Sequence, residues 1–311
     1  MTGQRILRIV DGKPAVMVPY PERIAAQLAA QYGALNTRAL ELVDRYLVPA
    51  IASGSKPRMR AAIAQIERTL ASEYSDRKVA AMASAAGKQA NGYNSTLFLG
   101  ALGVAIGAKI LAPSGSAPVR GEKTRGKVLP LRPRPGATLT IRTQVDPALW
   151  STDFVRENVA LIGDLRRGIV PGLEDAVIRA VDRGKDPTEL AEELRKIWKR
   201  NGVPSTLATG EGRTMSLEAH AQLVAEDQIN KLNARLSMER QLAAGIDSFR
   251  WRTRGDDRVR QRHRDLEGTV WTWESGGPAG VGLPGHPVRC RCSAEAVIDR
   301  AAVWASLGLA A

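Results

Sequence analysis

The sequence predicts a mainly helical protein that carries a small α+β module in its carboxy-terminal part. Apolar residues make up 44% of the chain but aromatic residues only 5%, a balance that favours helices over a barrel or sandwich. Ala and Leu recur at intervals of three and four residues, and strand-like alternation is concentrated near the carboxy terminus. We expect four consecutive segments: a basic helical region with an amino-terminal hairpin (1–112), a basic Pro/Gly-rich linker (113–145), a second helical region (146–245) and the α+β module (246–311).

The amino-terminal segment begins with two short strands and continues as helices. "RILRIVDGKPAVMV" predicts a hairpin around Asp11-Gly12, because this pair favours a tight turn. From Glu22 to about Ala86 the apolar spacing is helical, and Leu40, Val43 and Leu47 form one apolar face that we expect to be buried.

The stretch 97–112, "LFLGALGVAIGAKILA", is apolar on all sides apart from Lys109. Sixteen residues of helix extend about 24 Å, which is short of the roughly 30 Å of a bilayer's hydrocarbon core. We therefore expect a buried or oligomer-facing helix, with membrane contact through this stretch as the alternative.

The linker is rich in Pro, Gly and Ser and cannot bury a core of its own. It also carries six of the basic residues that we expect to contact nucleic acid: Arg120, Lys123, Arg125, Lys127, Arg132 and Arg134.

Positive charge is concentrated in the first half of the chain. Residues 1–150 hold 21 Lys/Arg against 9 Asp/Glu, whereas residues 151–311 hold 24 against 23. This asymmetry indicates a polyanionic partner such as nucleic acid or an anionic membrane surface, and a basic surface without a partner is the alternative.

Helical patterns return after the linker. Pro171 and Gly184 delimit one predicted helix, and Asp186 and Gly202 delimit the next. A long helix is predicted over 216–244, and the polar residues in its middle predict a solvated or partner-facing side.

The module starts at "FRWRT", where Arg250 and Arg252 alternate with Phe249 and Trp251. A short helical turn is expected to follow, capped by Asp256 or Asp257 and ended by Gly268. The spacing of Val259, His263 and Leu266 turns His263 inward and leaves Arg258 outside. "TVWTW" and "VRCRCSAEAVI" predict two further strands.

Two interpretations of these arginines stay open. Arg250 and Arg252, interleaved with tryptophan, suit a nucleic-acid backbone and stacked bases. A local network of arginine–carboxylate pairs explains the pattern equally well, because Asp256, Asp257, Asp265 and Glu267 lie in the same stretch.

His263, His286, Cys290 and Cys292 form a candidate structural zinc site. Cys290 and Cys292 face the same side of an extended chain, and two imidazoles would complete a four-ligand shell. A core histidine with two buried free thiols is the alternative. A disulfide fits poorly, because residues two apart in a strand hold their Cβ atoms too far apart.

Nothing in the sequence indicates an enzyme. There are three histidines, no nucleophile–base pair and no phosphate-binding glycine loop. The start of the chain lacks the pattern of a secretory signal, so we expect synthesis in a reducing cytoplasm.

The carboxy-terminal half resembles the phage Mu F-like minor head proteins, also called phage head morphogenesis proteins. The resemblance spans roughly 150–298 and rests on "ENVALI", "AEDQINKLNARLSMERQLAAGIDSFRWRT", "DDRVRQRHRDLEG" and "PGHPVRCRC", in that order. Family members that bind metal through a Cys-x-x-Cys or Cys-x-x-His pair have it at the positions of Arg260 and His263; because Arg260 is not a usual ligand, the site would depend on His286. The motif residues expected to frame the module are Trp251, Asp257, Arg258, Leu266 and Gly268.

The resemblance implies a non-enzymatic minor capsid protein of a tailed phage. Such a protein is built into the procapsid in few copies, near the portal and beside capsid or scaffold proteins. It contacts packaged double-stranded DNA, and in some relatives it leaves with the genome. We accordingly expect it in the virion interior, and in the host cytoplasm during assembly. A nucleic-acid-binding protein of the cytoplasm, a metal-dependent nuclease and a membrane-active ejection protein are the alternatives.

Overall fold

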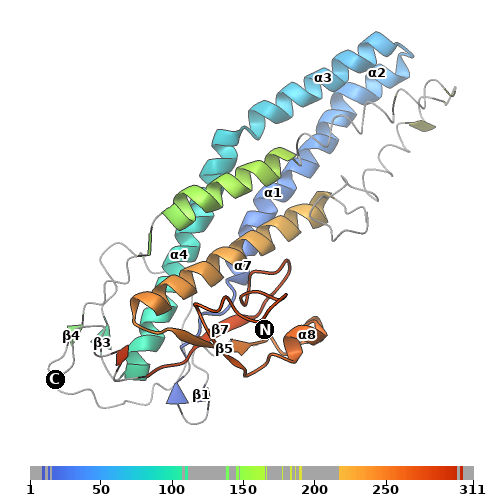
Figure 1. Cartoon of the computed structure of the whole chain (residues 1–311). Helices are drawn as coiled ribbons and strands as arrows, with labels where there is room; N and C mark the ends of the chain where they lie inside the picture. Colours follow the sequence, from blue (N-terminus) through green and yellow to red (C-terminus); the bar gives the residue numbers. More distant parts are fainter. Residues whose placement is uncertain are drawn as a thin grey trace. The chain divides into compact units, whose positions relative to one another are not determined.

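The computed structural model describes residues 9–10, 13–14, 16–106, 109–110, 138–139, 145–146, 148–164, 217–299 and 302–303, with positions 166, 177, 183, 186, 189 and 190. The described chain is mostly helical and has one three-stranded antiparallel sheet near its carboxy-terminal end, so the predicted fold class is confirmed (Figure 1). Outside these ranges lie the six basic linker residues and most of the helices predicted over 171–184 and 186–202.

The chain divides into two compact units, and each unit is built from separate stretches of sequence. Unit 1 combines Met1–Ile24, Ala86–Asp153 and Asp227–Ala311, and unit 2 combines Ala25–Ala85 with Phe154–Glu226. This division differs in kind from the four consecutive segments expected from the sequence.

Unit 2 is helical over its described residues. It takes in most of α1 (Glu22–Leu42), the π-helical turn η1 (Val43–Leu47), α2 (Val48–Ala52), α3 (Lys56–Glu73) and the start of α4 (Asp76–Ile106). Ser55 caps α3 by accepting a hydrogen bond from the Arg58 N–H, and Pro57 occupies its first turn. On the predicted apolar face, Val43 and Leu47 are buried and Leu40 is half-buried.

Two polar contacts join distant parts of unit 2. The Arg38 guanidinium makes two hydrogen bonds, of 2.7 and 2.8 Å, to the Glu73 carboxylate. The buried Tyr32 hydroxyl donates to Asn158 Oδ1 at 2.9 Å, which links α1 to the helix over 154–164.

The apolar stretch predicted over 97–112 is the end of a longer helix. α4 continues to Ile106, and Lys109–Ile110 forms strand β3, paired in parallel with β4 (Thr138–Leu139). Phe98, Leu102 and Ile106 are buried in the core of unit 1, as the buried-helix interpretation expects. None of the helices over the described ranges has an apolar window long enough to span a bilayer.

The hairpin predicted at the amino-terminal end is present. β1 (Ile9–Val10) and β2 (Lys13–Pro14) pair antiparallel, with Val10 opposite Lys13 on either side of the Asp11-Gly12 pair. The chain then enters the core of unit 1, where Val16 and Val18 are buried beside Phe98 and Ile246.

The polar middle of α7 (Leu217–Ala243) is buried, which corrects the expected solvated side. Asn94 on α4 donates to Asn233 Oδ1 and Ser237 Oγ at 2.9 Å each, and Arg240 donates to the side chains of Asn94 and Asn91. These hydrogen bonds give the buried amides of Asn94 and Asn233 and the Ser237 hydroxyl partners inside the protein, as buried polar groups require.

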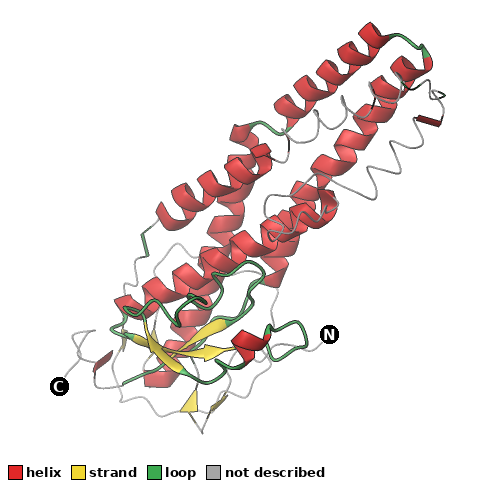
Figure 2. Cartoon of the chain, turned by 45° about the vertical axis from the view of Figure 1, so that its right-hand side comes forward, coloured by secondary structure: helices red, strands yellow, loops and turns green. Residues whose placement is uncertain are grey.

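The sheet of unit 1 has the strand order β6-β5-β7 (Figure 2). β5 (Ser248–Arg252) is central, with β6 (Val270–Thr272) and β7 (Ser293–Ala296) antiparallel to it. β7 starts directly after Cys292, so the third strand is shorter than the one predicted over 288–298, and both cysteines lie in the loop before it. The Ala296 N–H donates to the Val16 carbonyl at 2.9 Å, which brings the amino-terminal segment to the outer edge of β7.

Candidate metal centre and its arginine-lined pocket

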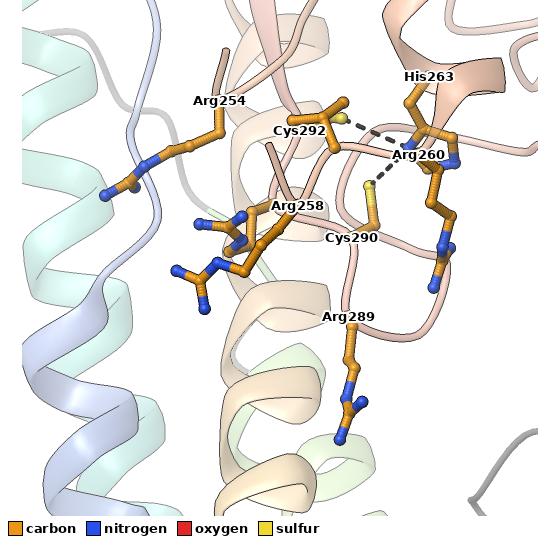
Figure 3. A pocket seen from close by; sticks show the side chains of 9 residues that line it. Arg254, Arg258, Arg260, His263, Arg289, Cys290 and Cys292 are labelled. Atoms are coloured by element: carbon orange, nitrogen blue, oxygen red, sulfur yellow. Dashed lines mark hydrogen bonds between the residues drawn. The ribbon is translucent and has the colours of Figure 1, made fainter. Parts of the chain in front are cut away.

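Three of the four residues predicted as metal ligands meet beside the sheet. His263 Nδ1 lies 3.5 Å from Cys290 Sγ and 3.5 Å from Cys292 Sγ, and the ligand atoms of all three lie within 4.8 Å of one another (Figure 3). All three residues are buried, and both cysteines are free thiols. We call this group the Cys/Cys/His cluster.

His263 faces inward as the helical spacing predicts. It lies on the single turn of α8 (Gln261–Arg264) and is 2% exposed, whereas Arg258, Arg262 and Arg264 are exposed. The edge of the Trp251 ring contacts the imidazole, with ring centroids 5.5 Å apart at 88°. Gly268 ends this region with a φ of +80°, as predicted. The predicted cap by Asp256 or Asp257 is wrong: the N-cap position of α8 is Arg260, which makes no capping hydrogen bond, and Asp256 accepts the Arg258 N–H in the turn before the helix.

The loop that carries Cys290 is held against α7. Asn230 donates to the carbonyl groups of Gly285 and Cys290, and the Gly285 N–H donates to Cys290 Sγ at 3.4 Å. Gly285 has a φ of +86°, and a Cβ atom there would lie 2.9 Å from the Cβ of Ala234. Glycine is therefore required at this position for the loop to approach the helix so closely.

His286 does not join the cluster among the described residues. Burial lowers the pKa of its imidazole, and the positive charges of Arg235 and Lys231 on α7 lower it further. His286 thus faces a basic part of α7. The N–H of its neighbour Gly285 points toward Cys290 Sγ. The spacing of these residues in the sequence does not show whether the His286 side chain faces the sulfur atoms or α7.

The two thiols influence each other, and their pKa values move in opposite directions. A hydrogen bond from the Cys292 thiol lowers the pKa of Cys290 to about 6 against the opposing effect of burial, and the backbone N–H groups of Cys292 and Gly285 lower it further. The pKa of Cys292 is raised, first by its hydrogen bond to Cys290 and then by burial. One thiolate is therefore available near neutral pH, which is the form that binds a metal ion.

The donor set suits a metal ion. A tetrahedral zinc ion holds thiolate sulfur at about 2.3 Å and imidazole nitrogen at about 2.0 Å, which places them about 3.5 Å apart. Both sulfur–Nδ1 distances in the cluster equal that separation. The cluster could thus hold a metal ion through three protein ligands.

A small pocket opens onto the cluster, and arginines line most of its wall (Figure 3). Some of these arginines are neutralised: Arg254 pairs with Glu22, and Arg291 pairs with Asp256 at 2.7 Å. The hydrogen bond from Arg291 holds the pKa of the Asp256 carboxyl below its usual range. The remaining residues of the wall are Arg258, Val259, Arg260, Arg289, His263, Cys290 and Cys292.

The strand arginines predicted to contact nucleic acid are part of the module's own packing. β5 buries Phe249 and Trp251 and leaves Arg250 and Arg252 half-buried, as the alternation predicts. Arg252 pairs with Glu295 on β7 and with Glu267, and its side chain is only 13% exposed. The geometry of Arg252 thus favours the arginine–carboxylate network over direct contact with nucleic acid.

The remaining motif residues frame this region. Leu266 packs against the apolar cluster of Phe249, Trp251 and Trp273. The exposed Asp257 supplies its backbone carbonyl to Arg264. Trp251 and Leu266 therefore pack beside the Cys/Cys/His cluster, whereas Asp257 joins the turn before α8 to Arg264.

The geometry defines a helical protein with a small α+β module whose cluster can hold a metal ion. Residues 172–295 match the model of the family described as phage Mu protein F like protein. That range contains the whole cluster, so this part of the chain is similar to the Mu F-like family, and the resemblance predicted from its motifs is confirmed.

A curated relative is also similar to this chain. A protein of Haemophilus influenzae (strain ATCC 51907 / DSM 11121 / KW20 / Rd), described as an uncharacterized protein, is 30% identical over 142 residues, which is 46% of this chain and 28% of the relative. The chain thus covers little more than a quarter of that relative. No solved structure matches the chain.

Proposed function

We propose that this protein is a non-enzymatic minor head protein of a tailed phage, built into the procapsid near the portal. The match of residues 172–295 to the Mu F-like family carries the proposal, because it links the module to phage heads. In this role the module docks on portal, capsid or scaffold proteins inside the head. The protein is present in the host cytoplasm before assembly and in the virion afterwards.

The basic first half of the chain supports a second part of the proposal, which is contact with packaged double-stranded DNA. Its excess of 21 Lys/Arg over 9 Asp/Glu attracts a polyanion, and the linker residues between 113 and 138 hold much of that charge. Delivery with the genome would follow from this contact. We propose no membrane role for 97–106, because its large side chains Phe98, Leu99 and Leu102 are buried in a core.

A structural metal ion, most simply zinc, is the third part. Cys290, Cys292 and His263 would hold it, and it would supply a cross-link between α8 and the start of β7. The thiols of a protein made in a reducing cytoplasm remain available for that binding.

Co-assembly tests the proposal. Portal and coat proteins are expressed with and without this chain, and the purified proheads are examined by mass spectrometry. We expect the chain in proheads that contain portal, at few copies per particle, and also in mature virions. Its absence from both kinds of particle would contradict the proposal, and incorporation without portal would contradict the portal contact.

A further inference from the structure

Three of the pocket arginines have no carboxylate partner among the described residues. Arg258 and Arg289 are exposed, and neither guanidinium makes a hydrogen bond or ion pair to a described residue. Arg260 donates only to the Val288 carbonyl. Asp256 lies near Arg258 but already pairs with Arg291. We call Arg258, Arg260 and Arg289 the arginine rim.

The backbone at Arg289 adds an independent observation. Arg289 has a φ of +59°, and among the described residues it is the only non-glycine residue with a positive φ. A glycine would adopt this conformation without strain, whereas the Cβ of arginine makes it costly. The Arg289 side chain is exposed, so its own packing does not offset that cost. A role for the charge itself explains why arginine occupies this position.

The arrangement of the rim indicates the kind of anion. The ends of the Arg258, Arg260 and Arg289 side chains lie apart from one another and do not converge on one point (Figure 3). A ligand with several spaced negative charges fits this arrangement better than a single ion does. Guanidinium groups are also well suited to phosphate oxygens.

The wall of the pocket excludes recognition by base stacking. Among the described residues that line it, the only aromatic ring belongs to His263, which is buried. Single-stranded nucleic acid is normally held by exposed aromatic rings on which the bases stack. The arginine rim can contact phosphate groups but offers no surface for stacked bases. This suits duplex DNA, whose bases stay stacked inside the helix.

We propose that the arginine rim at the mouth of the Cys/Cys/His pocket binds the phosphate backbone of double-stranded DNA without reading its sequence. This rests on the proposed function, in which the protein contacts packaged DNA through its basic first half, and it adds a contact from the module. It assigns that contact to Arg258, Arg260 and Arg289 in place of Arg252, whose charge is already paired with Glu295.

Salt-dependent binding of the full chain to a 30-base-pair duplex tests the proposal. The double variant Arg258→Gln/Arg289→Gln is compared with Arg60→Gln/Arg262→Gln, which removes the same charge from exposed positions that do not line the pocket. We expect the rim variant to bind at least about tenfold more weakly at 0.1 M salt and to reduce the slope of log K against log salt by about two. The control should stay close to the wild type, and both variants should unfold at the wild-type temperature.

Equal losses in the two double variants would overturn the proposal, because binding would then follow total charge. Wild-type affinity in the rim variant, or no DNA binding by the wild type, would overturn it as well. Prohead incorporation of the same variants separates this inference from the proposed function. If the chain enters proheads but the rim variant shows no specific loss of DNA binding, only the DNA contact of the arginine rim is contradicted. If the chain never enters proheads, the proposed role in the head is contradicted.

Discussion

At the scale of single residues, the candidate metal site depends on which way its two histidines face. The spacing of Val259, His263 and Leu266 was enough to turn His263 inward, because helical periodicity fixes which side chains share a face. His286 was grouped with it on residue type alone. Its imidazole faces Arg235 and Lys231, a placement that depends on how the loop packs against α7.

Metal content distinguishes the three cluster residues from His286. We expect the chain purified from zinc-supplemented cells to contain about one zinc ion, because two cysteines and a histidine supply three of the four ligands of a tetrahedral zinc ion. Cys290→Ser/Cys292→Ser should lose the ion and His286→Asn should keep it, measured by inductively coupled plasma mass spectrometry. Loss of zinc in His286→Asn, or a wild type without metal, would contradict this.

Replacing Arg289 by glycine should stabilise the protein. Relief of the left-handed strain is worth about 1–2 kcal/mol, and the extra freedom of glycine in the unfolded chain removes about 0.4–1 kcal/mol. We expect a net gain on the order of 0.5–1 kcal/mol, measured by urea unfolding. A loss of stability would mean that the Arg289 side chain contributes to folding.

His220 should make folding sensitive to mild acid. Its ring is buried, neither ring nitrogen has a hydrogen-bond partner among the described residues, and burial lowers its pKa. Because the folded protein resists protonation, the full stability is present above the unfolded pKa of about 6.5 and decreases as the pH falls below it.

A leucine at this position isolates the effect. Between pH 7 and pH 5.5 the wild type should lose up to about 1.4 kcal/mol more stability than His220→Leu, measured by urea unfolding at each pH. Parallel pH profiles of the two proteins would assign the acid sensitivity to other groups.

At the scale of elements, periodicity located α1, α3 and α7, and the hairpin was predicted by its turn residues. Two features of the helices were not predicted from the sequence. The stretch 97–106 continues α4, because nothing in 87–96 interrupts a helix. The polar stripe of α7 was expected to face solvent, but Asn233 and Ser237 meet Asn94, a partner 139 residues from Asn233 in sequence. A sequence pattern predicts that polar side chains are exposed. It does not reveal a hydrogen-bond partner that comes from a distant part of the chain and allows them to be buried.

The approach of the 283–290 loop to α7 can be tested at Gly285. Gly285→Ala should cost about 2–4 kcal/mol, because the new Cβ adds a clash with Ala234 to the cost of a positive φ. Gly280→Ala is the matched control, since Gly280 also has a positive φ but open space around its Cβ. It should cost only about 1–2 kcal/mol. Thermal unfolding of both variants gives the comparison, and equal costs would contradict the close contact.

At the scale of the whole molecule, each unit is assembled from stretches that the sequence presents as unrelated. Composition separated a basic first half from a balanced second half, but packing follows a different division. Unit 1 joins Val16 to β7 and the end of α4 to Ile246. A sequence pattern shows which apolar residues are candidates for the core, because it records only that they are apolar. It does not show which of them pack against one another.

The contribution of the amino-terminal segment to unit 1 can be measured. Val16→Ala/Val18→Ala should destabilise the protein by about 2–4 kcal/mol, because both side chains are buried beside Phe98 and Ile246. Val270→Ala is the control, because Val270 is 52% exposed and its truncation should change stability little. Urea unfolding monitored by tryptophan fluorescence reports the loss, and equal effects would contradict the burial.

The hydrogen bond from the Ala296 N–H to the Val16 carbonyl also determines when unit 1 can complete its folding during synthesis. A ribosome adds about 5–20 residues per second, so the 280 residues between the two positions take roughly 15–60 s to emerge. Throughout that interval the valines at the front of the chain have no strand to pair with. Completion of this unit therefore waits until Ala296 has been synthesised, and a nascent chain that stalls before that residue would present those valines to chaperones.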